Sequence, residues 1–209
     1  MKNNTVVILA NGRFPQADRP TQILNQAGTI VCCDAAADAL LEYGIIPDVI
    51  IGDMDSLSVS TRKKYREKII QVADQETNDL TKAVFYCVEK GYKEVVILGA
   101  TGKREDHTLG NISLILEYAR QIDVKMVTDY GEFGILKSGE EVASFPGERV
   151  SFFSKDHQLK VSSTGLLYSL EELQLQNWWR ATLNEVISDS FTLYFDSSIP
   201  LLMFRSFSQ

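Results

Sequence analysis

Carboxylate side chains recur directly after strand-like runs in the first part of this chain of 209 residues. The clearest case is the segment Gly52-Asp53-Met54-Asp55-Ser56, which follows the apolar run Val49–Ile51. Two carboxylates at positions i and i+2 can reach one hard cation, and Mg²⁺ needs few of them because water and substrate phosphates complete its octahedron. The simpler interpretation is a turn in which aspartates accept bonds from nearby backbone N–H groups. The spacing therefore predicts either a magnesium site or a capped turn.

A second cluster, Glu76-Thr77-Asn78-Asp79-Leu80-Thr81-Lys82, lies at the predicted start of a helix. Thr77 or Asn78 suits the N-cap, and Asp79 is a first-turn acid of the kind that the helix dipole favours. The same helix start offers backbone N–H groups to a phosphate, with Lys82 as a counter-charge and Asp79 as a contact to metal or water. A capped helix with a solvated lysine and a phosphate site both fit the sequence.

A third cluster reads Gly-Ala-Thr-Gly-Lys-Arg-Glu-Asp-His and occupies residues 99–107. Its glycines allow backbone amides to approach phosphate, and the run leads into a helix that opens at Asp106. Thr101 and Gly102 are therefore candidates for phosphate binding, and Arg104 suits a bidentate grip on phosphate oxygens. The order of residues differs from the GxxxxGK[ST] loop of P-loop proteins.

These clusters meet only if they belong to one parallel sheet, because ligands bind beyond the carboxyl ends of such strands. Carboxylates follow strands or open helices at that predicted edge in five places: Asp34, Asp53, Asp55, Asp79 and Asp106. Together with the nearby cations they predict one acidic site that binds a metal and a phosphorylated ligand.

The elements that position these residues alternate between strand and helix. Short, β-branched and continuously apolar runs suit strands that are buried on both faces of a parallel sheet. The predicted strands are Thr5–Ala10, Thr29–Cys33, Val49–Ile51, Lys68–Val72, Glu94–Leu98 and Val124–Thr128. The predicted helices are Ala35–Tyr43, Asp79–Lys90 and Glu105–Gln121. This alternation predicts an α/β domain with a doubly wound, mostly parallel sheet.

After about Gly131 the pattern changes to short strands separated by Gly, Ser and Pro. The predicted strands are Phe133–Leu136, Val150–Phe153, Leu159–Val161, Phe191–Phe195 and Leu201–Phe204. Such a series is typical of a small all-β sandwich or barrel. We therefore predict an α/β domain at residues 1–135 and a β-sandwich domain at residues 136–209.

The composition excludes some classes of partner. The formal net charge is −7, with 28 acidic residues against 21 Lys and Arg. An acidic protein gains no long-range attraction to nucleic acid or to a membrane surface, so we expect neither as a partner. The first apolar run, Val6–Ala10, is too short for a secretory segment or a membrane span. The three cysteines, two of them adjacent, form no disulfide framework, which favours a cytoplasmic location.

Four segments, taken in order, resemble the thiamine pyrophosphokinase family. They are Cys33–Asp38, Pro47–Ser56, Thr77–Ala83 and Thr101–Asn111. The resemblance covers about residues 5–130, and four ordered motifs make it highly specific. The last third of the chain matches more loosely, chiefly at Ser163–Tyr168.

The resemblance implies an ATP-binding α/β domain, a β-sandwich domain, and a homodimer with active sites between subunits. It also implies transfer of pyrophosphate from ATP to the hydroxyl of thiamine, which gives thiamine diphosphate and AMP. It assigns Mg²⁺ and catalysis to Asp53, Asp55 and Asp79, with Asp106 beside them. The nucleotide and its phosphates fall to Asp34, Lys82, Thr101, Gly102 and Arg104.

The chain departs from the family pattern at two places. Ala35 stands where the family has a glycine after the aspartate of its first motif. Near the end, Ser188-Asp189-Ser190 replaces the usual Ser-Asn that precedes an acidic residue. We expect Ser188 and Asp189 to bind thiamine together with Tyr168, and Trp178 and Trp179 are candidate walls for a flat, cationic ligand.

The mechanism implied by the resemblance is an in-line attack of the thiamine hydroxyl on the β-phosphorus of ATP. Such transfers depend on positioning and charge neutralisation. Either Asp55 or Asp79 is a candidate for the residue that deprotonates the hydroxyl. Two alternatives remain open from the sequence: a metal-dependent nucleotide pyrophosphohydrolase with water as acceptor, and a catalytically silent sensor that binds thiamine or a nucleotide.

Overall fold

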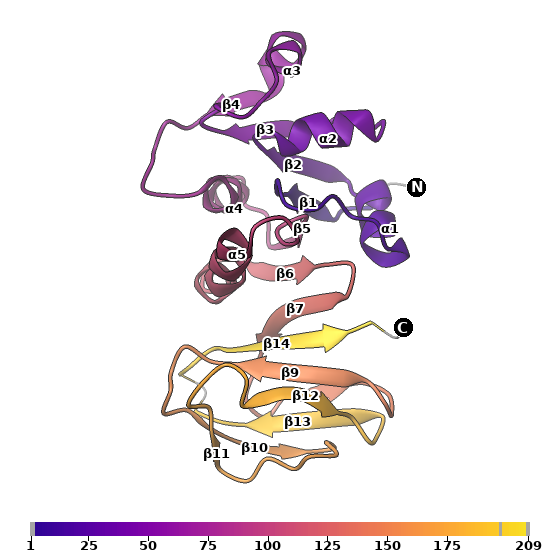
Figure 1. The fold of residues 1–209 in the computed structure, drawn as a ribbon, viewed down its shortest axis with the longest axis vertical. Coiled ribbons are helices and arrows are strands. Elements are labelled where there is room, and N and C mark those ends of the chain that lie inside the picture. The colour runs from indigo at the N-terminus through magenta and orange to yellow at the C-terminus, as the bar shows by residue number, and fades with distance from the viewer. Residues whose placement is uncertain (1–2, 197, 208–209) are drawn as a thin grey trace. The chain divides into compact units, whose positions relative to one another are not determined.

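The fold comes from a computed structural model that describes residues 3–196 and 198–207. The chain divides between Asp129 and Tyr130 into two compact units, shown in Figure 1. The predicted boundary near residue 135 lies inside strand β7 (Gly131–Leu136), which pairs along its length with β14 (Leu201–Ser206) of the second unit.

The first unit contains a parallel sheet, as the alternating sequence pattern predicts. Its strand order is β6-β5-β1-β2-β3-β4, and each pair of neighbours is parallel. The strands are β1 (Val6–Leu9), β2 (Thr29–Cys33), β3 (Val49–Gly52), β4 (Ile69–Gln71), β5 (Glu94–Leu98) and β6 (Asp123–Val127). The central strands β1 and β2 are buried almost throughout, which explains their unbroken apolar runs.

The helices of this unit are α1 (Asp18–Gln26), α2 (Ala36–Glu42), α3 (Val59–Lys64), α4 (Asp79–Glu89) and α5 (Glu105–Tyr118), with a 3₁₀ turn at Arg66–Lys68. From β1 the chain first winds towards β4 and then returns to β5 and β6, and right-handed crossovers place α1 and α2 opposite α4 and α5. Helix α4 packs on β1, β2 and β3, and α5 packs on β6. The sheet is therefore doubly wound.

The direction of winding reverses between β1 and β5, and this reversal opens space at the carboxyl ends of those strands. The loops after them are joined by backbone bonds: Ala10 N–H donates to the Leu98 carbonyl at 2.9 Å, and Arg13 N–H donates to the Thr101 carbonyl at 2.7 Å. An added Cβ at Gly12 would lie 2.3 Å from the Gly99 carbonyl oxygen, so this crossing of loops requires glycine.

The second unit is an antiparallel β-sandwich. One sheet has the order β12-β9-β14-β7 and the other β11-β10-β13-β8. The strands not yet given are β8 (Glu141–Ala143), β9 (Arg149–Phe153), β10 (Lys160–Thr164), β11 (Leu173–Gln174), β12 (Ala181–Glu185) and β13 (Ser190–Tyr194). Phe152 and Leu201 of one sheet and Val161, Phe191 and Leu193 of the other lie in its core. The α/β and all-β predictions are both confirmed.

No helix among the described residues combines the length and the apolar character that crossing a bilayer requires.

Candidate active site

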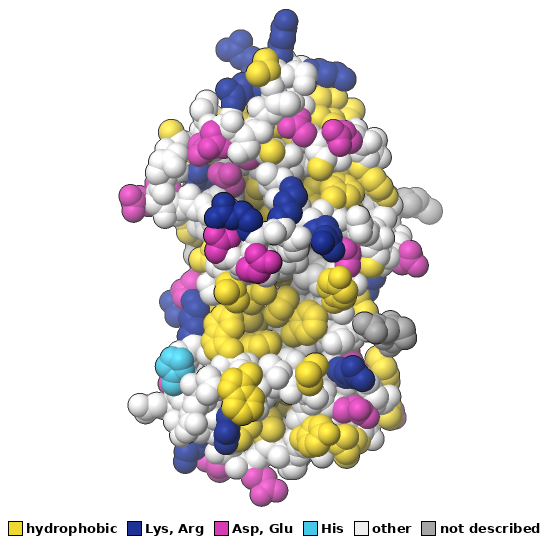
Figure 2. Space-filling view, in the orientation of Figure 1, with side chains coloured by type: hydrophobic (Ala, Val, Ile, Leu, Met, Phe, Trp, Pro, Cys, Tyr) yellow, Lys and Arg dark blue, Asp and Glu magenta, His cyan; other side chains and the backbone are white. Residues whose placement is uncertain are grey.

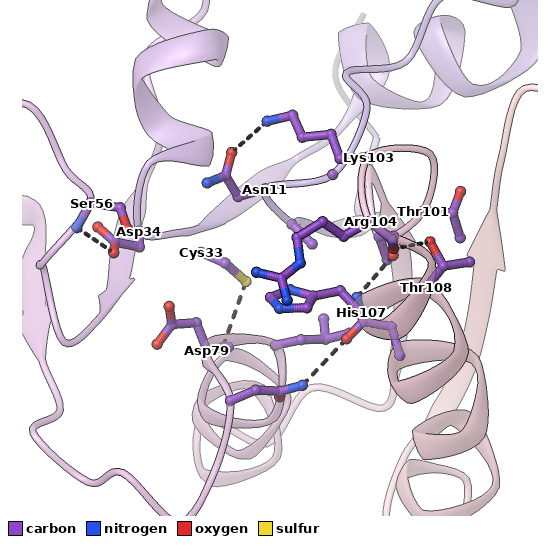
Figure 3. A pocket seen from close by; sticks show the side chains of 16 residues that line it. Asn11, Cys33, Asp34, Ser56, Asp79, Thr101, Lys103, Arg104, His107 and Thr108 are labelled. Atoms are coloured by element: carbon purple, nitrogen blue, oxygen red, sulfur yellow. Dashed lines mark hydrogen bonds between the residues drawn. The ribbon is translucent and has the colours of Figure 1, made fainter.

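The carboxyl edge of the first unit's sheet carries a cavity of about 370 Å³ (Figure 3). Its walls come from the loops after β1, β2, β3 and β5, from the first turn of α4 and from the first two turns of α5. The lining residues are Ala10, Asn11, Gly12, Cys33, Asp34, Ser56, Asn78, Asp79, Leu80, Ala100, Thr101, Lys103, Arg104, His107, Thr108 and Asn111.

Three carboxylates gather beside this cavity. Asp34, Asp53 and Asp55 each offer an oxygen, and these oxygens lie within 4.8 Å of one another. Such a group of hard, anionic oxygens suits a divalent cation of the Mg²⁺ type, and repulsion between them is relieved when a cation binds. The sequence analysis places Asp34 at the same edge as Asp53 and Asp55 but assigns it to the nucleotide, whereas the structure brings its carboxylate into the group that could hold a metal.

Asp34 is the buried member of this group, with 3% of its surface exposed. Its Oδ2 accepts a bond from Ser56 N–H at 3.2 Å, while its buried Oδ1 accepts none from the described residues. Burial raises the pKa of Asp34 to about 6, a rise that the Ser56 N–H reduces and the charges of Asp79 and Asp55 increase. A buried carboxylate oxygen without a donor is an observation that a bound cation would explain.

The local backbone lets these groups approach one another. Asp34 has φ 43° and Met54 has φ 70°, both in the left-handed region that residues with a Cβ rarely occupy. Met54 buries its side chain at 2% exposure, so the residues on either side of it turn outward. At the end of β3, an added Cβ on Gly52 would lie 3.1 Å from both Asp34 Cβ and Asp79 Oδ1. A side chain at this position would crowd both carboxylates, so glycine favours their close packing.

Asp53 also caps the turn that follows β3, as the simpler interpretation of the sequence predicts. Its Oδ1 accepts a bond from Asp55 N–H at 3.1 Å, and its Oδ2 accepts one from Gln75 Nε2 at 3.2 Å. These bonds, first that from Asp55 and then that from Gln75, lower the pKa of Asp53. Gln71 Nε2 holds the Asp53 carbonyl at 3.0 Å. The turn chemistry keeps the carboxylate ionised, so it does not compete with a metal-binding role.

The start of α4 is capped by Asn78, one of the two predicted N-caps. Asn78 Oδ1 accepts a bond from Thr81 N–H at 2.9 Å. Asp79 follows in the first turn and is one of the residues that line the cavity (Figure 3). The ammonium of Lys82 lies 3.0 Å from Asp79 Oδ1, and the Lys82 side chain is only 4% exposed. Lys82 therefore contacts the site through Asp79 and is not one of the lining residues.

The loop after β5 supplies the cationic side of the cavity. Thr101, Lys103 and Arg104 line it, and Gly102 in the same loop has φ 88°. Arg104 Nε and Nη2 donate to the two oxygens of Asp106, and this pair is largely exposed. Arg104, together with the backbone N–H of His107, lowers the pKa of Asp106 to about 2. Asp106 thus orients Arg104 and lies outside the group of clustered carboxylates.

Sequence reasoning assigned no role to two asparagines of the cavity. Asn11 Oδ1 accepts a bond from Lys103 Nζ at 3.1 Å. Asn111 Nδ2 donates to the Ala100 carbonyl at 2.8 Å, and its Oδ1 accepts from Asn78 at 3.3 Å. The position of Asn11, directly after the predicted first strand, is the signal that would have found it.

The three residues expected to bind thiamine lie in the second unit. Tyr168 N–H donates to Asn184 Oδ1 at 3.1 Å, and Ser188 Oγ donates to the Ser190 carbonyl at 2.6 Å. Asp189 is exposed, and its carbonyl accepts from Ser144 N–H at 2.8 Å. Backbone bonds between residues 165–167 and 185–187 bring the Tyr168 and Ser188 segments side by side.

The chain matches two family descriptions in succession. Residues 20–127 match "Thiamin pyrophosphokinase, catalytic domain", and residues 131–201 match "Thiamin pyrophosphokinase, substrate-binding domain". The thiamine pyrophosphokinase of Bacillus subtilis is 30% identical over 184 residues, which cover 83% of this chain and 85% of that protein. Thiamin pyrophosphokinase 1 of Caenorhabditis elegans is 27% identical over 213 residues, covering 93% and 87%.

Solved structures share the fold over nearly the whole chain. The thiamine pyrophosphokinase structure from B. subtilis has a TM-score of 0.80 at 24% identity and covers 99% of this chain and 100% of its own. The structure from Candida albicans has a TM-score of 0.80 at 19% identity, covering 98% and 90%.

The family matches define a transferase whose α/β unit is the catalytic domain and whose β-sandwich unit is the substrate-binding domain. The chain belongs to the thiamin pyrophosphokinase family.

Proposed function

We propose that the carboxyl edge of the first unit's sheet is where this chain carries out the reaction of its family. As a family member, the chain transfers pyrophosphate from ATP to thiamine, which gives thiamine diphosphate. The observation that carries the location is the group of carboxylates, Asp34, Asp53 and Asp55, beside a cavity with a cationic far side.

The first part of the proposal concerns the metal. A kinase of this family uses a metal associated with its nucleotide, and we propose Mg²⁺ held by Asp53 and Asp55 with Asp34. The unpartnered buried oxygen of Asp34 and the distances below 4.8 Å support this fit. Bound Mg²⁺ would neutralise charge on the phosphates of ATP. Asp79, which the sequence also assigned to metal binding, lies beside Gly52 and is already paired with Lys82.

The second part concerns the phosphates. We assign the phosphates to the loop after β5. Thr101 and Arg104 of this loop line the cavity, and Gly102 allows the loop backbone to turn with a positive φ. Asp106 holds the guanidinium of Arg104 by two bonds, which leaves its remaining N–H groups for phosphate oxygens. Lys82 neutralises Asp79 and so reduces the repulsion between the acidic edge and the polyphosphate.

In the proposed reaction the primary hydroxyl oxygen of thiamine bonds to the β-phosphorus of ATP. The bond between that phosphorus and the oxygen bridging to the α-phosphorus breaks, and AMP leaves with the electron pair. The hydroxyl proton passes to a carboxylate, for which Asp55 and Asp79 are the candidates. Asp55 is exposed and Asp79 lines the cavity, so both are accessible to a bound alcohol.

Thiamine is assigned to the second unit, which matches the substrate-binding part of the family. Tyr168, Ser188 and Asp189 are the proposed contacts. Figure 2 shows hydrophobic side chains exposed over this unit, and Tyr168 and Trp179 are 65% and 68% exposed. Such surfaces suit a homodimer with active sites between subunits, which we propose for this chain.

The free, buried cysteines Cys32, Cys33 and Cys87 suit a reducing environment, and we propose a cytoplasmic location.

The test of this function is a product assay with purified protein, ATP, Mg²⁺ and thiamine. Thiamine diphosphate and AMP should appear in equal amounts, and neither should form when Mg²⁺ is chelated. AMP and free diphosphate without consumption of thiamine would identify a hydrolase instead. Stabilisation by ligands without any product would identify a sensor.

A further inference from the structure

The loop that carries Asp53 and Asp55 is held at its far end by Asp38, an aspartate outside the carboxylate cluster. Asp38 lies in α2, and its Oδ2 accepts a bond from Ser58 N–H at 2.9 Å. Its Oδ1 accepts bonds from the Ser58 hydroxyl at 2.6 Å and from the Thr61 hydroxyl. Three donors at the start of α3 therefore converge on one carboxylate.

The bonds to Asp38 have the character of charge-assisted hydrogen bonds. Burial alone raises the pKa of a half-buried carboxyl, but the bonds from Ser58 and Thr61 outweigh it and lower the pKa of Asp38. Ionised acceptors bind N–H and O–H donors about twice as strongly as neutral ones. Ser58 Oγ also accepts from Thr61 N–H at 3.2 Å, so the carboxylate and the N-cap of α3 form one network.

This network fixes the metal-binding loop relative to Asp34. The loop leaves β3 at Gly52 and reaches the network at Ser58. Between these points, Asp34 Oδ2 accepts from Ser56 N–H at 3.2 Å, and Leu57 packs in the core at 5% exposure. The chain segment that places Asp34 in the cluster continues into α2 and places Asp38 under the end of the loop. One short segment, residues 34–38, therefore contacts both the cluster and the end of the loop.

We propose that Asp38 is a positioning residue for the pyrophosphoryl transfer. It sets the distance between the loop of Asp53 and Asp55 and the carboxylate of Asp34, and thereby the affinity of the cluster for a divalent cation. The inference rests on the proposed function, in which this cluster holds the metal. Asp38 itself contacts neither metal nor substrate. Removing a group that orients metal ligands lowers metal affinity about ten- to a hundredfold.

The experiment measures metal binding directly. Mn²⁺ is titrated into the nucleotide-free protein, and the free ion is followed by its electron paramagnetic resonance signal. In Asp38→Ala the Kd for Mn²⁺ should rise about tenfold. This factor is at the lower end of the ten- to hundredfold range because Asp38 acts on the metal ligands indirectly, through Ser58 and Thr61. In assays the Mg²⁺ concentration for half-maximal turnover should rise by the same factor. The KM for thiamine should stay unchanged, and turnover at saturating Mg²⁺ should recover.

Two further variants separate positioning from stability. Asp48→Ala removes a carboxylate that accepts a bond from Ile30 N–H at 2.8 Å, at the other edge of the sheet. It should lower the unfolding temperature and leave the Kd for Mn²⁺ unchanged. Thr61→Val removes one donor to Asp38 without changing side-chain shape, and it should raise the Kd in the same direction by a smaller factor. Thr61→Val decides the matter if Asp38→Ala does not fold.

The outcomes distinguish this inference from the proposed function. If Asp53→Asn leaves Mn²⁺ binding unchanged, the cluster is not the metal site, and the metal assignment under the proposed function falls. If Asp53→Asn weakens binding while Asp38→Ala and Thr61→Val bind like the wild type, the metal site stands and the role of Asp38 is refuted. If Asp48→Ala loses as much affinity for Mn²⁺ as Asp38→Ala, the effect of Asp38 is one of general stability, and its role as a positioning residue is refuted.

Discussion

The ammonium of Lys82 lies 3.0 Å from Asp79 Oδ1, one turn further along α4, and the two side chains are 4% and 29% exposed. A lysine that is this deeply buried needs a partner, because an unpaired charge away from water is costly. Asp79 therefore stabilises the fold by pairing with a buried lysine, whereas Asp55 is exposed. The two carboxylates, although close to one site, should respond differently to removal.

We predict that Asp79→Ala destabilises the protein and that Asp55→Ala does not. Loss of Asp79 leaves Lys82 buried without its carboxylate, which costs about 1.5–3 kcal/mol for a hydrogen bond to a charged group. Loss of Asp55 removes repulsion from Asp34 and Asp53. Urea denaturation of the metal-free proteins measures both effects. Equal stability of Asp79→Ala and the wild type would show that Lys82 finds another partner.

Arg104→Lys tests the bidentate grip of the loop after β5. Lysine keeps the charge but lacks the planar fork that donates to both oxygens of Asp106. We expect a clear loss of kcat/KM for ATP. Because Arg104 and Asp106 are largely exposed and their attraction is screened by water, the free energy of unfolding should change little. Unchanged kinetics would mean that Arg104 is only a surface partner of Asp106.

Asp34 gives the metal-free protein a pH dependence with a defined sign. Its pKa in the folded protein is about 6, above the ordinary value of 3.8, so the folded state holds this proton more tightly than the unfolded chain. The stabilisation from Asp34 is therefore complete below about pH 4 and is lost as the pH rises through 6. Relative to Asp34→Asn, the wild type should lose stability over this range. A difference that does not vary with pH would contradict the burial of an ionisable Asp34.

Asp189→Ala tests the assignment of thiamine to the second unit. Asp189 is exposed and can accept a bond from the aminopyrimidine or attract the thiazolium charge. We predict a several-fold higher KM for thiamine and little change in the KM for ATP. Asp196→Ala is the matched control, because Asp196 is an exposed carboxylate of the same unit that bonds only locally to Ser198 among its described hydrogen bonds. Equal KM values in both variants would remove Asp189 from the site.

The sheet of the first unit could be predicted from sequence because its signals are local. Thr29–Cys33 and Glu94–Leu98 are mostly buried runs rich in β-branched residues, and both were predicted with the bounds that the structure has. Helix α4 has a cap, an apolar face and a terminal glycine in its own sequence. Where the chain itself carries the reason for an element, periodicity and end signals suffice.

Elements that depend on distant partners were not predicted. Helix α1 has no side-chain cap of its own, and the N–H groups of Gln16 and Ala17 at its start donate to Asp129, more than a hundred residues away. Helix α3 is short, with Thr61 as its buried residue, and Asp38 of α2 holds its start. Strand β12 contains a bulge and a left-handed Leu183. No local pattern encodes such contacts.

The candidate site could likewise be predicted only where the reason lies in the order of the elements along the chain. The order of strands explains why Asp53, Asp79 and Arg104 gather at one edge, and the sequence indicates it. The left-handed turn at Asp34 that adds a third carboxylate to the cluster depends on backbone packing against Gly52, which no spacing rule contains. The pairing of Arg104 with Asp106 was likewise beyond the sequence, because two neighbouring charges fix no geometry.

The most direct test of the account is the turnover of Asp53→Asn and Asp55→Asn at saturating Mg²⁺, ATP and thiamine. Each variant keeps the size and polarity of the side chain but removes one anionic oxygen ligand. Thiamine diphosphate formation should fall at least about a hundredfold in each variant, and the unfolding temperatures should be at or above that of the wild type. Turnover near the wild-type value in both variants would contradict the location of the reaction at this edge of the sheet.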